Sequence, residues 1–212
     1  MKRFQVVVPP GWTMLDLTIE IDPQIRAFVT RRLSGSAPSR AQALRANLTS
    51  SLLDVAKSLA DGGAVALTIA TKPVDGFTGS PTTVFLPLSV PEGQEPLDVL
   101  LAIASTDPTA QAVDVGELVS VRISSTSDAT EAVRGSLEQA SALTGGRAPE
   151  GTDRPTGEHR HVRYLVGDPG DRDRWVDAAF SVTCTSLPGS SELADSAIEL
   201  FDTTMQSFRW LS

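Results

Sequence analysis

The only cysteine of the chain, Cys184, is the first side chain in this sequence that could do chemistry. It lies in the stretch FSVTCTSLPG, residues 180–189. A nucleophilic cysteine needs a histidine or a helix N-terminus to stabilise its thiolate. Residues 175–185 alternate as a strand does, and Cys184 falls on the same side as four apolar residues, which are Val176, Ala178, Phe180 and Val182. We therefore predict a buried core residue rather than a reactive thiol.

The only two histidines, His159 and His161, form the second group. On a strand, residues two apart share a face, so this pair could ligate a metal ion if Glu158 or Asp177 supplied a third ligand. Arginines flank the pair, and their positive charge disfavours a cation. The sequence thus favours a solvent-facing pair without a metal.

Three aspartates in DPGDRDR, namely Asp168, Asp171 and Asp173, form the third group. Their spacing is not that of a calcium-binding EF-hand loop. Three arginines surround them, which are Arg163, Arg172 and Arg174. We predict a charged hairpin turn here.

Recognisable catalytic motifs are absent from the sequence. No G-x-S-x-G elbow occurs, since Gly79-Ser80 is followed by Pro81 and Gly189-Ser190 by Ser191. Neither G-x-x-x-x-G-K-[ST] nor G-x-G-x-x-G is found. We assign no catalytic, cofactor-binding or metal residue, expect no cofactor, and predict that the protein is not an enzyme.

Composition sets the class of protein. The chain has 212 residues, 41% hydrophobic and 21% charged, which is typical of a globular protein with one sizeable core. Its net charge of −8 repels nucleic acid and anionic lipid. The longest apolar runs, AVALTIA and VLLAIA, are far shorter than the roughly 20 residues of a membrane span. Two prolines interrupt the start, MKRFQVVVPPGW, so we do not expect a signal peptide and expect a cytoplasmic protein without membrane insertion.

The pattern of hydrophobic residues predicts alternating groups of strands and helices. We expect strands at 3–8, 12–17, 64–71, 82–90, 158–166 and 175–185, one or two strands within 113–126, and helices at 21–33, 39–61 and 95–106. Asp22 and Pro23 are the expected cap and first residue of the first helix. Pro169-Gly170 suits a type II turn.

The last helix is expected after LPGSS, with Ser190 or Ser191 as its cap. Its apolar stripe comprises Leu193, Ala197, Phe201, Met205 and Phe208. We expect this stripe to cover the preceding hairpin.

Residues 125–157 are rich in Ser, Thr, Gly, Glu and Arg and poor in large apolar side chains. A short helix around Val133 is compatible with this composition, and the rest is loop-like. We interpret the segment as a polar, flexible insertion within one domain spanning 1–212. Because many strands follow one another directly, the fold class is α+β with a largely antiparallel sheet packed against helices.

The two ends of the chain carry a family resemblance. Pro9-Pro10-Gly11-Trp12, Leu200-Phe201-Asp202 and Arg209-Trp210 resemble features of a family of uncharacterised actinobacterial proteins of about 200 residues. The closing hairpin and helix are also similar to the PsbP-like fold, which includes the Ran-binding protein Mog and bacterial secretion-effector chaperones. The match covers the first 20 and last 50 residues. It implies a PsbP/Mog-like α/β/α sandwich and a scaffold that binds proteins, and it transfers no site residue.

Two functions lead at this point, with a purely structural subunit of a larger assembly as a third. The first is a non-enzymatic protein-binding, adaptor or chaperone-like module whose partner is another protein. The alternative is a small-molecule-binding protein or an unrecognised hydrolase with a pocket between sheet and helices. For the alternative, Cys184 or the pair His159 and His161 would have to line that pocket.

Overall fold

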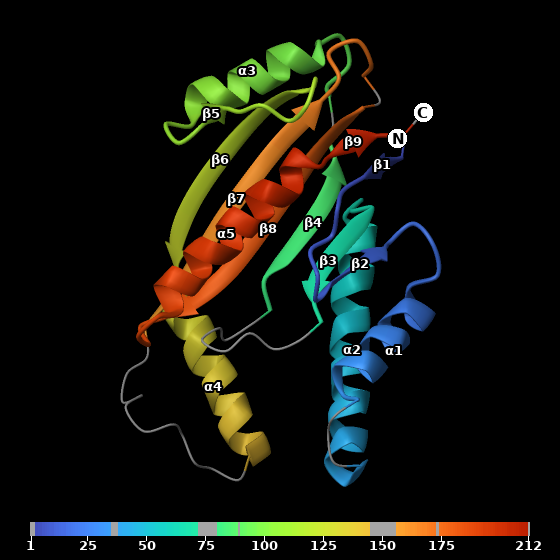
Figure 1. The fold of residues 1–212 in the computed structure, drawn as a ribbon, viewed down its shortest axis with the longest axis vertical. Helices are drawn as coiled ribbons and strands as arrows, with labels where there is room; N and C mark the ends of the chain where they lie inside the picture. Colours follow the sequence, from blue (N-terminus) through green and yellow to red (C-terminus); the bar gives the residue numbers. More distant parts are fainter. Residues whose placement is uncertain are drawn as a thin grey trace.

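The protein is built around one large antiparallel sheet with helices on both of its faces (Figure 1). A computed structural model describes residues 3–34, 38–71, 80–88, 90–144, 156–172 and 174–211. A second, two-stranded sheet joins segments near the two ends of the chain, which lie side by side in Figure 1.

The strands are β1 (Phe4–Gln5), β2 (Trp12–Asp16), β3 (Ala66–Ala70), β4 (Thr82–Pro87), β5 (Gln111–Ala112), β6 (Val119–Asp128), β7 (Gly157–Gly167), β8 (Trp175–Thr185) and β9 (Arg209–Trp210). The helices are α1 (Ile21–Arg32), α2 (Pro38–Asp61), α3 (Pro96–Thr106), α4 (Thr130–Thr144) and α5 (Ser190–Gln206).

The large sheet has the order β2-β3-β4-β8-β7-β6-β5, and all neighbouring strands are antiparallel. β8 pairs with β7 along its whole length, and with β4 over six residues. This second pairing joins strands from the first half of the chain to the C-terminal hairpin. The α5 side of the sheet therefore contains side chains from both halves of the sequence.

α5 covers the first face of the sheet. Its Phe201 and Met205 pack on alternate residues of β7 and β8, including Tyr164 and Phe180. Phe180 and Phe201 stack with ring centroids 5.0 Å apart, and Tyr164 meets Phe201 edge-on at 5.5 Å. The prediction that the last helix covers the hairpin is confirmed.

The second face of the sheet is covered in two places. α1 and α2 pack on β2, β3 and the β4 residues Val84 and Leu86. α3 packs with Leu100 on Val121 of β6 and Leu165 of β7. Because Val84 and Leu165 alternate with residues that face α5, the helices α1, α2 and α3 share one side of the sheet.

The outer edge of β2 is occupied at its two ends. The Gln24 side chain accepts a hydrogen bond from the Asp16 amide at 2.9 Å and donates to the Asp16 carbonyl at 2.7 Å. The Trp12 amide donates to the Pro9 carbonyl. Side chains and turns that occupy edge groups in this way hinder the addition of another strand.

The expected α+β class with a largely antiparallel sheet is confirmed, but several local expectations are wrong. The first strand ends at Gln5 rather than Val8, because the Val7 amide bonds to the Ser207 hydroxyl and the chain leaves the β9 partner. α1 begins at Ile21 with Glu20 as its N-cap, so Asp22 and Pro23 lie inside the first turn.

The hairpin between β7 and β8 is not a type II turn. Gly170 lacks the positive φ that a type II turn requires. The Asp168 side chain instead accepts a hydrogen bond from the Gly170 amide at 2.9 Å, and the Asp168 carbonyl accepts one from the Asp171 amide. An aspartate that satisfies the turn in this way removes the need for a left-handed glycine.

The apolar stripe on α5 is confirmed at Phe201 and Met205, which are buried, and at Ala197, which packs against the core. Leu193 is the exception: it is 38% exposed, and Ala194 is buried in its place. Gly189 is the N-cap, with a positive φ, and Ser190 is the first helical residue. Phe208 packs beyond the helix, stacked on Phe4 at 5.2 Å.

The polar segment 125–157 contains more structure than its composition indicates. Its first four residues extend β6, and Thr130–Thr144 form α4. Val133 of α4 is fully buried against Gly157 at the start of β7. Residues 145–155 lie outside the described residues. Within the described part of the chain, none of the helices combines the length and apolar character that crossing a bilayer requires.

Candidate functional site

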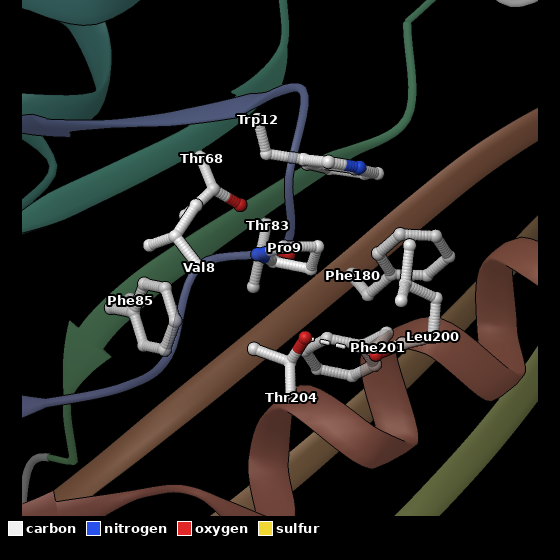
Figure 2. Close-up of a pocket in the computed structure, with 10 residues that line it drawn as sticks. All are labelled: Val8, Pro9, Trp12, Thr68, Thr83, Phe85, Phe180, Leu200, Phe201 and Thr204. Carbon is white, nitrogen blue, oxygen red and sulfur yellow. Dashed lines mark hydrogen bonds between the residues drawn. The ribbon is translucent and has the colours of Figure 1, made fainter.

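A shallow apolar groove lies beside α5, on the face of the sheet that this helix covers (Figure 2). The space between its walls, open solvent included, is about 300 Å³, of which a water-sized molecule can occupy only about 20 Å³. The sheet forms the floor of the groove, α5 one wall, and the segment leading into β2 the other wall. The lining residues are Val8, Pro9, Trp12, Thr68, Thr83, Phe85, Phe180, Leu200, Phe201 and Thr204.

The wall from Val8 to Trp12 is held in place by a tight turn. Gly11 takes φ +83°, which only glycine adopts readily. Its carbonyl accepts two hydrogen bonds from Thr71, one from the amide and one from the hydroxyl, each at 2.7 Å. Pro9 and Pro10 restrict the chain before the turn. The sequence PPGW therefore builds a stiff wall that ends in a half-buried indole.

The opposite wall, α5, is fixed by polar contacts on the side away from the groove. Arg122 of β6 bonds both carboxylate oxygens of Asp202, at 2.9 and 3.2 Å, and the Tyr164 hydroxyl donates to the same carboxylate at 2.9 Å. Arg160 of β7 donates to Asp195 at 2.6 Å and to Ser191 at 2.7 Å. The bidentate, partly buried pair of Arg122 and Asp202 holds α5 in one position, and the more exposed contacts of Arg160 add to it.

These polar partners were not found by the sequence reasoning. Arg122, Arg160, Asp195 and Asp202 lie on three separate elements, and only the sheet order brings them together. The spacing of Asp195 and Asp202, seven residues apart on one helix, was the only indication in the sequence.

The interior of the groove is mainly apolar with two polar groups in its floor. Thr68 and Thr83 are buried, and Figure 2 shows the Thr68 hydroxyl directed toward the groove. The Thr204 hydroxyl donates to the Leu200 carbonyl at 2.9 Å, so it is used within the helix. Leu200 is 38% exposed at the rim.

Cys184 is where the sequence predicted it, in the core beneath α5. It is 4% exposed, and its thiol donates to the Glu158 carbonyl at 3.5 Å. Burial raises the pKa of the thiol, and the Arg160 charge opposes that rise. A thiol with a raised pKa is a poor nucleophile at neutral pH. Cys184 does not line the groove.

His159 and His161 lie side by side on β7, on the face opposite α5, and do not line the groove either. Neither suggested third ligand joins them. Glu158 lies on the α5 face and pairs with Arg160, while Asp177 pairs with Arg163. Among the described residues, no group of three or more metal-ligating side chains is gathered.

The aspartates of the hairpin form ion pairs with arginine. Arg174 pairs with Asp168 at 3.3 Å and with Asp171 at 3.4 Å. Asp173 lies outside the described residues. Cys184, the two histidines, Asp168 and Asp171 are thus not among the residues that line the groove.

Comparisons with known proteins give no further assignment. The chain matches no protein-family model, no curated protein and no solved structure.

Proposed function

We propose that the protein is a non-enzymatic binding module that holds an extended segment of another protein, with one large apolar side chain of that segment inserted in the groove beside α5. The observation that carries this proposal is an apolar groove between two fixed walls, with Leu200 exposed at its rim.

The size of the groove favours a side chain over a free small molecule. Open solvent included, the space between its walls is about 300 Å³, but a water-sized molecule can occupy only about 20 Å³ of it. Ligand pockets typically measure about 300–1,000 Å³ and enclose most of their ligand. This groove is too small for that and is open along one side, so an apolar side chain laid against it from an extended backbone suits it better than a free small molecule.

Pre-organisation also favours binding. The turn at Gly11 fixes one wall, and the arginine pairs of Asp195 and Asp202 fix the other. Fewer groups must therefore become ordered when a partner binds, which lowers the entropic cost of association. The net charge of −8 favours a partner with basic residues beside its apolar anchor. The resemblance to PsbP-like proteins points to the same class of function.

Selection from a displayed library of random peptides tests this proposal with the full chain. We expect enriched peptides to share one large apolar residue with basic neighbours. Their affinity should fall about tenfold or more in Leu200→Glu, because a carboxylate at the rim would have to be desolvated against apolar walls.

Val55→Glu is the matched control, since Val55 is an exposed apolar residue of α2, 52% exposed, far from the groove lining. It should leave the affinity unchanged. Failure to enrich any peptide, equal affinity in Leu200→Glu, or binding of small apolar molecules alone would each overturn the proposal. Circular dichroism spectra and melting curves of both variants would establish that they are folded.

A further inference from the structure

The only two histidines of the chain meet on the side of the sheet opposite the groove. The ring centroids of His159 and His161 are 4.3 Å apart, with an angle of 47° between the planes. Both side chains are half-buried, so each keeps contact with solvent. Two imidazoles at this separation can direct ring nitrogens at one small ion.

The surroundings of the pair are rich in hydroxyl groups. The strand register places Ser127 and Thr183 on either side of His159, and Ser125 and Ser181 on either side of His161. Residues directly opposite one another in a sheet share a face. Ser181 is hydrogen-bonded to Thr82 at 3.1 Å.

Thr183 orients one of the two rings. Its hydroxyl oxygen lies 2.6 Å from Nδ1 of His159. When Nδ1 carries the proton and donates to this oxygen, Nε2 keeps its lone pair for a ligand. Metal-binding histidines commonly have their other ring nitrogen held by such a partner.

The arginines next to the pair along β7 are neutralised or turned away. Arg163 makes two hydrogen bonds to the carboxylate of Asp177. Arg160 points to the α5 face, where it pairs with Glu158 and Asp195. The positive charge that counted against a cation in the sequence is thus largely compensated in the fold.

We propose that His159 and His161 chelate one divalent transition-metal ion, with Cu²⁺ bound most tightly and Ni²⁺ and Zn²⁺ more weakly. This order follows from the general preference of nitrogen ligands. Each histidine gives one ring nitrogen, and water fills the remaining positions, since Glu158 and Asp177 are committed elsewhere. The site is therefore open and exchangeable, and it is independent of the groove beside α5.

Calorimetric titration of the full chain with Cu²⁺ tests the proposal. We expect one ion per chain and at least about tenfold weaker binding in His159→Gln and in His161→Gln. Binding should be lost in the double variant. Thr183→Val, which removes only the orienting hydroxyl, should weaken binding by about 10-fold to 100-fold.

Electron paramagnetic resonance of the Cu²⁺ complex gives a second measurement, which a loss of protein stability in a variant would not reproduce. The spectrum should contain hyperfine coupling to two imidazole nitrogens, and to one in each single variant. Cys184→Ser is the matched control and should bind as the unchanged chain does, because the thiol lies on the other face. Undiminished binding in the double variant, coupling to fewer than two nitrogens in the unchanged chain, or no stoichiometric binding would overturn the proposal.

Discussion

At the scale of single residues, Tyr164 shows how burial and charge set a side chain's chemistry. It is the only tyrosine of the chain, is 2% exposed, and donates its hydroxyl to Asp202. Burial and the neighbouring carboxylate raise its pKa well above the usual value of a phenol. Tyr164 therefore remains protonated throughout the physiological range, and its hydrogen bond helps to hold α5.

Alkaline titration should report on this residue alone. Because the folded pKa lies above the unfolded one, the contribution of Tyr164 to stability is present below about pH 10 and is lost as the pH rises above that value. When the folded protein is titrated with base, we expect phenolate absorbance to appear only at the pH at which the protein unfolds. In the denatured chain, the tyrosine should titrate near pH 10. A native titration near pH 10 without unfolding would contradict the assigned contact. Tyr164→Phe should remove the phenolate signal.

At the scale of elements, close contacts between neighbours fix how the long hairpin is built. Gly167 ends β7 opposite Trp175, the first residue of β8. A Cβ at Gly167 would lie 1.9 Å from the indole of Trp175, which is 1% exposed. The glycine is needed because the indole occupies the place of its side chain.

Gly167→Ala should therefore destabilise the protein, by about 1–3 kcal/mol from overpacking. Gly135→Ala is the matched comparison, because Gly135 lies inside α4 with nothing within 4 Å of the added carbon. That change should stabilise by about 0.5–1 kcal/mol through reduced chain entropy. Urea unfolding measures both. Equal effects of the two alanines would mean that the indole does not pack against Gly167.

Helices and strands were predictable where the local spacing of apolar residues determines them. The alternation of 175–185 placed Cys184 in the core, and the spacing of leucines gave α2. Leu193 was wrongly placed in the buried stripe because each four-residue step drifts by about 40° around a helix of 3.6 residues per turn. Leu193, two such steps before Phe201, therefore lies outside the buried face, whereas Ala194, seven residues before Phe201, lies within it.

The groove itself could not be predicted from the sequence. Its lining comes from segments around residues 8–12, 68, 83–85, 180 and 200–204, which meet only because β4 pairs with β8. The turn PPGW was recognisable as a break, but its contact with Thr71 depends on the pairing of β2 with β3. Long-range pairing of strands is the information that a local pattern lacks.

At the scale of the whole molecule, the sheet connects the three hydrophobic clusters. β4 contributes Phe85 to the cluster under α5 and Val84 to the cluster under α1 and α2. β7 likewise contributes to the clusters on both faces. Elements that share strands in this way are expected to unfold together.

We expect one cooperative transition in urea, with coincident curves from far-ultraviolet circular dichroism and tryptophan fluorescence. Trp175 reports the α3 side of the sheet, and Trp210 reports the paired ends of the chain. Separate midpoints for the two probes would indicate that part of the molecule unfolds on its own.

Binding of a peptide in the groove beside α5 can be followed through the indole N–H resonances of the three tryptophans. Trp12 lines the groove, whereas Trp175 and Trp210 do not. On titration of the ¹⁵N-labelled protein with a selected peptide, we predict that the Trp12 resonance shifts in proportion to binding while the other two stay in place. A bound peptide that leaves the Trp12 resonance unmoved would contradict the proposed site.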